Sequence, residues 1–279
     1  MIRSKSFDGS KPVIYLIATP IGNLNEFSKR AIDVINEMDI IAAEDTRNAF
    51  SLLAKFNIKK ELFSLREHNE IEASKQILKM IKAGKKVAYM SDAGYPGISD
   101  PGYLLVKEMI NNDIAVSTIS GSSAFINALV ASGLPTNHFY FFGFLSAKEN
   151  EAKQQLENIK SITDTIIFYE APHRIVKTLA LLKDALGNRK ICLARELTKL
   201  NEEYIRGTLD ELVTIDESTL KGEMVLIIEG NQEKETVSDE QIKQRVAYFT
   251  KLGLSQKDAI NVVAEQYKVN KNYVKKLVF

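Results

Sequence analysis

The segment 91–102, with the sequence SDAGYPGISDPG, is the part of the chain best suited to ligand chemistry. It follows a buried apolar strand pattern and precedes a helical pattern, so we expect it at the carboxyl end of a sheet, where open α/β folds bind ligands. Its three glycines and two prolines favour a fixed backbone that a ligand can approach closely. Asp100 precedes Pro101 at a helix start, which favours N-capping. Asp92 has no such structural role and is expected to bind a ligand.

Two further loops of small and polar residues also join a strand to a helix. These are residues 19–24, TPIGNL, and residues 120–124, SGSSA. Ser122 or Ser123 could simply cap the helix that follows. However, polar loops at neighbouring strand ends can form one pocket, with donors for a carboxylate or a ribose. Three such loops in register therefore predict one binding site.

Several common functional classes lack their sequence signals. The chain has neither G-x-x-x-x-G-K-[ST] nor G-x-G-x-x-G after a strand, which argues against a P-loop NTPase and an ordinary dinucleotide-binding fold. The single cysteine, Cys192, and three scattered histidines form no metal-ligand pattern, so no metal is expected. The 37 basic and 36 acidic residues nearly balance, so any RNA-binding surface must be a local patch. No signal peptide or membrane span is evident, which makes the cytosol the expected compartment.

The elements that position these loops alternate along the chain. Apolar runs predict strands at residues 13–18, 39–43, 62–64, 86–90, 115–119, 139–143, 165–169, 190–194, 204–207 and 222–229. Amphipathic patterns predict helices at residues 26–37, 46–56, 70–83, 102–112, 122–132, 149–160 and 173–186. This alternation predicts an α/β protein with a mostly parallel first sheet. The strands at 204–207 and 222–229 are close enough to pair antiparallel, which predicts a mixed second sheet.

The C-terminal part differs in character from the rest. Residues 230–237 are polar and charged, which suits a linker, and three helices are predicted at 239–251, 255–267 and 271–277. Ser255 and Asn270 are expected N-caps. Residues 255–279 carry five lysines against two acidic residues. This helix-turn-helix-like appendage could contact RNA or could merely pack on the body of the protein.

Six segments in order resemble one family. Residues 18–24, 43–47 (AEDTR), 91–102, 168–174 (FYEAPHR), 193–199 (LARELTK) and 222–225 (GEMV) are similar to those of the ribosomal RNA small subunit methyltransferase I family, in the tetrapyrrole-methylase-like class. The resemblance covers about residues 12–230 and extends into the appendage. Gly97, Ser146 and residues 201–203 depart from the usual family sequence.

The resemblance implies a fold and an activity. The expected fold is two α/β domains with a cofactor cleft between them. The pattern of elements along the chain places these domains at residues 12–121 and 122–230, followed by the helical appendage at 238–279. The implied reaction is 2′-O-methylation by S-adenosylmethionine of a cytidine ribose, cytidine 1402, in the decoding region of 16S rRNA. The implied partners are 16S rRNA or the small ribosomal subunit and, usually, a second copy of the chain in a homodimer.

These segments, together with the 120–124 loop and Leu145, supply the candidate site residues. Methyl transfer needs alignment and loss of the hydroxyl proton, and the candidate bases are Glu170, His173 and Glu196. Candidate cofactor contacts are Pro20, Ser91, Asp92, Ala93, Ile98, Ser120, Ser122, Ser123, Leu145 and Met224. Candidate RNA phosphate contacts are Arg47, Arg174, Arg195 and Lys199, although each could equally form an ion pair within the protein.

Two other functions stay open at this point. A tetrapyrrole-ring methyltransferase would share the cofactor pocket and differ in the second domain, because fold alone does not fix the substrate. A ribosome-associated RNA-binding protein without catalysis is the non-enzymatic alternative. The intact loops around Asp92 and Ser122 argue against that alternative, and failure to bind S-adenosylmethionine would favour it.

Overall fold

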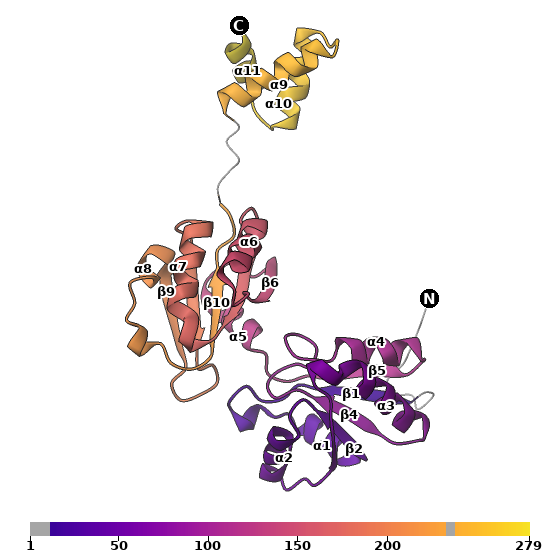
Figure 1. The fold of residues 1–279 in the computed structure, drawn as a ribbon. Coiled ribbons are helices and arrows are strands. Elements are labelled where there is room, and N and C mark those ends of the chain that lie inside the picture. Colours follow the sequence, from indigo (N-terminus) through magenta and orange to yellow (C-terminus); the bar gives the residue numbers. More distant parts are fainter. Residues whose placement is uncertain (1–11, 233–237) are drawn as a thin grey trace. The chain divides into compact units, whose positions relative to one another are not determined.

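The computed structural model describes residues 12–232 and 238–279, which form two compact units divided after Asn231. The first unit contains two five-stranded sheets, and the second contains three helices (Figure 1). Among the described residues, no helix combines the length and the apolar character needed to cross a membrane. The boundary expected between residues 121 and 122 stays a prediction, and the predicted linker lies partly outside the described residues.

The first sheet is parallel throughout and has the strand order β3-β2-β4-β1-β5. Its strands are β1 (Val13–Ile17), β2 (Ile40–Ala43), β3 (Glu61–Ser64), β4 (Val87–Met90) and β5 (Ala115–Ile119). Its helices are α1 (Lys29–Glu37), α2 (Thr46–Lys55), α3 (Glu70–Lys82) and α4 (Tyr103–Asn111). The predicted parallel sheet is confirmed.

Helices cover both faces of this sheet because its strands are apolar on both sides. Ile14 of β1 and Tyr89 of β4 pack with the apolar side chains of α3 and α4, whereas Ile17 and Met90 pack with those of α1 and α2. Successive side chains of a strand point to opposite faces, so unbroken apolar runs are the expected pattern for such central strands. Because the five strands are parallel, all their carboxyl ends lie at one edge of the sheet.

The second sheet is mixed and has the order β6-β7-β10-β8-β9. Its strands are β6 (Phe139–Phe144), β7 (Thr165–Glu170), β8 (Lys190–Arg195), β9 (Glu203–Thr208) and β10 (Met224–Ile228). Helix α5 (Ala124–Ser132) packs on one face. Helices α6 (Glu149–Ile159), α7 (Ile175–Leu186) and α8 (Leu209–Leu212) pack on the other face.

The predicted pairing of the last two strands is wrong, although the mixed sheet is confirmed. Strand β10 inserts between β7 and β8, and β9 pairs with β8 at the edge of the sheet. The physical reason is burial, since all five residues of β10 are buried whereas β9 has no buried residue. An entirely apolar strand belongs in the centre of a sheet, and a half-exposed strand belongs at its edge.

Some helix starts also differ from those predicted. Helix α1 begins at Lys29, not near residue 26, because the Ser28 hydroxyl caps it by accepting a hydrogen bond from the Ala31 amide. A 3-10 turn, Leu24–Glu26, precedes it. Another 3-10 turn, Pro172–Arg174, precedes α7, so His173 lies before that helix and not inside it.

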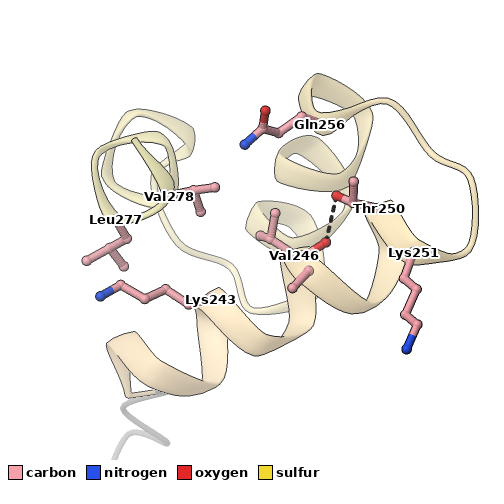
Figure 2. A pocket seen from close by; sticks show the side chains of 8 residues that line it. Lys243, Val246, Thr250, Lys251, Gln256, Leu277 and Val278 are labelled. Carbon is pink, nitrogen blue, oxygen red and sulfur yellow. Dashed lines mark hydrogen bonds between the residues drawn. The ribbon is translucent and has the colours of Figure 1, made fainter.

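The second unit consists of α9 (Asp239–Lys251), α10 (Gln256–Gln266) and α11 (Lys271–Val278). Ser255 and Asn270 are N-caps, as predicted, and accept hydrogen bonds from Asp258 and Asn272. The three helices share a core of their own, which includes Ile242, Val263 and Val274. A shallow groove between α9 and α11 exposes Lys243 and Lys251 beside Val246 and Leu277 (Figure 2).

Candidate functional site

The three loops predicted to form one site contact each other at the carboxyl edge of the first sheet. Thr19 and Gly94 exchange backbone hydrogen bonds of 2.9 and 3.1 Å, and the Thr19 hydroxyl donates to the Ser91 carbonyl at 3.2 Å. The Tyr95 hydroxyl accepts a hydrogen bond of 3.2 Å from the Gly121 amide. The loops after β1, β4 and β5 are therefore held together by direct contacts.

A cavity of about 310 Å³ opens beside these loops. The first part of the chain contributes Ile21, residues 93–95 and 98–100, and the start of α5. The second sheet contributes the ends of β6 and β7, the loop after β8 and the start of β10. Its size lies at the lower end of the range of small-molecule pockets. Strand ends from both sheets thus meet at one concave site.

Seven of the residues predicted for the site line this cavity, and ten do not. The lining includes Ala93, Ile98, Ser123, Glu170, Glu196, Lys199 and Met224. The other ten are Pro20, Arg47, Ser91, Asp92, Ser120, Ser122, Leu145, His173, Arg174 and Arg195. Sequence reasoning missed Tyr95, Phe144, Tyr169, Leu197 and Glu223, which also line it. The family segments quoted above contain four of them, Tyr95, Tyr169, Leu197 and Glu223. Their position in those segments was the sequence signal that could have identified them.

Glu170 is engaged on both carboxylate oxygens. It is 2% exposed, and one oxygen accepts from the Arg174 guanidinium and, at 2.7 Å, from the Ala171 amide. The other oxygen accepts from the Thr178 hydroxyl at 2.5 Å. Arg174 also donates to the Leu145 carbonyl at 2.8 Å, and the Leu145 side chain is buried in the core. This network is the geometry of a structural ion pair that fixes the end of β7 against α7.

The loop after β8 forms the opposite rim of the cavity. Lys199 Nζ lies 2.9 Å from a Glu196 oxygen and 3.9 Å from a Glu223 oxygen. Glu196 and Thr198 both have positive φ values, of 51° and 67°, so this turn is tightly constrained. A Cβ atom at Gly22 would lie 2.7 Å from Lys199 Cγ, so the loop after β1 approaches this rim closely.

The remaining candidate cations are also paired with carboxylates. Arg47 forms an ion pair of 2.5 Å with Asp45, and its side chain is 83% exposed. That pairing, through hydrogen bonds from Arg47, holds the pKa of Asp45 well below its usual range. Arg195 pairs with Glu203 at 2.5 Å across β8 and β9. His173 is exposed on the 3-10 turn before α7.

Two expectations for the aspartates of the 91–102 loop are wrong, since Asp92 has structural partners and Asp100 does not cap α4. The ligand role expected of Asp92 stays a prediction. Asp92 was expected to have no structural role, yet its oxygens accept from the Asp45 amide at 3.2 Å and from the Asn48 amide group at 2.7 Å. Asp100 was expected to cap α4, yet Gly102 occupies the N-cap position. A Glu70 oxygen accepts from the amides of Gly102, Leu104 and Leu105 at 2.8, 2.8 and 3.3 Å.

We expect Asp92→Ala to lower the free energy of unfolding by about 1 kcal/mol, because it removes two hydrogen bonds that hold the N-terminus of α2. Urea denaturation followed by circular dichroism measures this loss. Asp92→Asn should lose less, because its amide oxygen can keep one of the two bonds. If Asp92→Ala unfolds at the same urea concentration as the wild type, these two hydrogen bonds to the N-terminus of α2 contribute nothing to stability.

Burial and neighbouring carboxylates raise the pKa values of Asp100 and Glu44. Burial is the main cause of the raised pKa of Asp100, and Asp92 adds to it while a hydrogen bond with Ser91 opposes it. Burial followed by Asp100 and Asp92 raises the pKa of Glu44. Burial also raises the pKa of Tyr169, which lies across the cavity, to about 12. The site is therefore rich in negative charge and partly shielded from water.

Solved structures share this fold. Diphthine synthase superimposes with a TM-score of 0.61 at 14% identity, covering 78% of this chain and 89% of that one. The methyltransferase CobJ gives 0.58 at 18% identity, covering 82% and 98%. Uroporphyrin-III C-methyl transferase from Thermus thermophilus, solved in complex with S-adenyl homocysteine, gives 0.53 at 15% identity, covering 78% and 97%. These likenesses confirm the predicted fold class.

Sequence comparisons identify the family of the chain more closely than the fold does. Residues 13–213 match the family model of tetrapyrrole (corrin/porphyrin) methylases. Proteins named ribosomal RNA small subunit methyltransferase I are 47% identical in Halalkalibacterium halodurans, over 91% of this chain and 90% of that protein, and 40% identical in Bacillus subtilis, over 98% and 96%. The relative of that name in Vibrio cholerae is 41% identical over 98% and 96%. The chain therefore belongs to the ribosomal RNA small subunit methyltransferase I family, within the tetrapyrrole methylase class.

Proposed function

We propose that this protein transfers the methyl group of S-adenosylmethionine to the ribose 2′-oxygen of a cytidine in the decoding region of 16S rRNA, cytidine 1402. The relatives' name and their match over at least 90% of both chains support an rRNA substrate. The observation that carries the proposal is the cavity at the meeting point of the two sheets, because the six family segments either line it or hold the loops that do.

The cavity suits this cofactor chemically. Ile98, Leu197 and Met224 give it apolar walls, as an adenine ring requires. Four acidic residues, Asp100, Glu170, Glu196 and Glu223, line it with Lys199 as the one basic residue in the lining. This excess of negative charge favours a cationic ligand. Bound S-adenosylmethionine would supply a methyl group activated by its positively charged sulfur.

Contact with RNA phosphates is proposed first for Arg47. Its guanidinium is the most exposed of the four candidates, and the pair with Asp45 is a surface pair that contributes little energy. Arg174 and Arg195 have side chains that are only 22% and 17% exposed, and they form ion pairs with Glu170 and Glu203. Lys199 stands at the rim of the cavity and could reach a phosphate by leaving Glu196. The basic groove between α9 and α11 is a further candidate surface (Figure 2).

A homodimer in the cytoplasm is proposed as the working form of the protein. Strand β6 lies at the edge of the second sheet, and its residues Phe139 and Tyr140 are 44% and 42% exposed. Exposed aromatic side chains on an unpaired edge are unusual unless a partner covers them. Light scattering coupled to gel filtration would measure the mass in solution.

The function is tested by methyl transfer from labelled S-adenosylmethionine to small ribosomal subunits that lack modifications, with naked 16S rRNA as a second substrate. Nuclease digestion and mass spectrometry would locate the label. We expect it on one cytidine ribose in the decoding region. Cofactor binding without transfer to either substrate would reject the rRNA assignment and favour a tetrapyrrole, and no cofactor binding would favour a non-catalytic RNA-binding protein.

Ala93→Trp links the reaction to the cavity. Ala93 lines it, and an indole there would occupy space that the cofactor needs, so we expect cofactor affinity and transfer to fall at least tenfold. Ile71→Trp is the matched control, since Ile71 is 63% exposed on α3 and an indole there meets solvent. Normal cofactor binding by Ala93→Trp would place the cofactor elsewhere.

A further inference from the structure

The second unit differs in charge from the rest of the chain. Residues 1–232 include 28 basic and 30 acidic residues, whereas residues 238–279 include 8 basic and 4 acidic residues. The net charge of the first stretch is therefore slightly negative, and that of the second unit is positive. Proteins gain much of their affinity for nucleic acids from cations that neutralise phosphates. The excess of positive charge that such a polyanionic substrate requires thus lies in the second unit.

The cations of the second unit are not neutralised within the fold. Among residues 238–279, no lysine or arginine forms a salt bridge, whereas at least eleven described cations of the first unit do. Asp239 and Asp258 instead accept hydrogen bonds from the hydroxyls of Tyr273 and Ser255. The lysines of this unit are all exposed and are free to meet an external anion, namely Lys243, Lys251, Lys257, Lys268, Lys271, Lys275 and Lys276.

Two of these lysines line one concave surface, the groove between α9 and α11, which has a volume of about 570 Å³. Lys243 and Lys251 are eight residues apart on α9, so about 12 Å of helix separates them. Figure 2 shows Val246 between them on the same helix. Leu277 and Val278 of α11 complete an apolar floor. A floor of this kind suits the sugars of a nucleic acid, and two separated ammonium groups suit successive parts of its phosphate backbone.

We propose that the groove between α9 and α11 holds the phosphate backbone of the rRNA substrate, an inference that rests on the proposed function and names the surface that captures the RNA. Lys243 and Lys251 neutralise phosphates, and the side-chain amide of Gln256, at the start of α10, donates a hydrogen bond to a phosphate oxygen. Contacts of this type position an RNA without reading its sequence. The second unit then supplies affinity, and the first unit supplies the reaction.

This division of roles has a kinetic consequence. The two units belong to one chain, so RNA held by the second unit raises the effective concentration of the target nucleotide for the first unit. Loss of the groove lysines weakens this capture and leaves the chemical step as it was. A change that weakens only substrate binding raises KM and leaves kcat at saturating substrate unchanged.

The experiment combines Lys243→Gln with Lys251→Gln in the full chain and measures methyl transfer to small ribosomal subunits at saturating S-adenosylmethionine. We expect KM for the subunit to rise about tenfold with kcat unchanged, as loss of two phosphate contacts implies. Filter binding of naked 16S rRNA over a series of salt concentrations is the second readout. The slope of log affinity against log salt should become shallower by about 1.4–1.8, the contribution of two phosphates.

Two further double variants serve as controls. Lys243→Arg with Lys251→Arg keeps both charges and should restore most of the affinity and of the salt dependence. Lys85→Gln with Lys86→Gln removes the same charge from exposed positions just before β4, at the amino edge of the first sheet. This pair should change neither KM nor the salt slope, which separates a local contact from a general effect of net charge.

The outcomes separate the groove from the proposed function. Unchanged KM, rRNA affinity and salt slope in the glutamine variant would overturn the role of the groove alone. Weaker binding of subunits with normal binding of naked 16S rRNA would also overturn it, because the groove would then contact a ribosomal protein. Binding of 16S rRNA by the wild type without any methyl transfer would reject the proposed function, and the rRNA affinity of the glutamine variant would still decide the groove. If that variant loses helical circular dichroism, Lys243→Gln and Lys251→Gln are tested singly, each with half the change in slope expected.

Discussion

Arg174→Met should destabilise the first unit by about 3 kcal/mol, the largest loss expected from a single side chain here. Glu170 is 2% exposed, and the substitution leaves its carboxylate buried without a cation. The Arg174 side chain is itself only 22% exposed, so water compensates little. Methionine keeps the apolar stem of the arginine, which isolates the loss of charge. Urea denaturation followed by circular dichroism would measure the change.

A double-mutant cycle supplies the control. Replacing both groups, as in Glu170→Gln with Arg174→Met, should cost less than Arg174→Met alone, because no unpaired buried charge remains. Lys29→Met is the exposed counterpart, since Lys29 and Asp33 form an i,i+4 pair with side chains 87% and 55% exposed. It should change stability by less than about 0.5 kcal/mol. Equal effects of Arg174→Met and Lys29→Met would show that burial does not strengthen the Glu170 pair.

This network also bears on catalysis. Glu170 was one of three candidate bases, and its position at the end of β7 in the cavity lining is consistent with that idea. However, both of its oxygens are already occupied by hydrogen bonds from Arg174, Thr178 and the Ala171 amide. The geometry favours a structural role for Glu170 over a catalytic one.

The convergence of the three loops could be predicted from sequence. Parallel strands place their carboxyl ends at one edge, so the loops after them lie along the same edge. The three loops are neighbours because β1 lies between β4 and β5 in the sheet. The observed contacts of Thr19 with Gly94 and of Tyr95 with Gly121 are consistent with this placement. The N-caps Ser255 and Asn270 could also be predicted, because a cap depends on residues only two or three positions away.

Roles that depend on distant residues could not be predicted. Asp100 has the local pattern of a cap before Pro101, but the residue that caps α4 is Glu70, 32 residues before Gly102. Asp92 had no local partner, and its partners Asp45 and Asn48 are 47 and 44 residues away. The place of β10 in the second sheet is another long-range result. Chain proximity favoured pairing with β9, whereas burial put β10 between β7 and β8.

Glu70 provides the second large effect, because one buried carboxylate holds the end of the 91–102 loop at the start of α4. It is 8% exposed, and one oxygen accepts from three amides at the start of α4. We expect Glu70→Ala to lower the free energy of unfolding by about 2–3 kcal/mol, since hydrogen bonds to a charged group are stronger than neutral ones and the amides would be left unsatisfied. Thermal and urea unfolding would both report it.

The same substitution should weaken cofactor binding without touching the cavity. Glu70 does not line it, but the loop that Glu70 anchors contributes Ala93, Ile98 and Asp100 to the lining. A loop that is less ordered in the free protein must lose more conformational freedom on binding, so we expect affinity for S-adenosylmethionine to fall about tenfold by calorimetry. Glu72→Gln, two residues further along on the exposed face of α3, should change neither quantity. Glu70→Gln keeps an acceptor oxygen and should lie between Glu70→Ala and the wild type. Lower stability of Glu70→Ala with unchanged affinity would mean that the loop keeps its binding geometry without this anchor. The carboxylate would then serve only to begin α4.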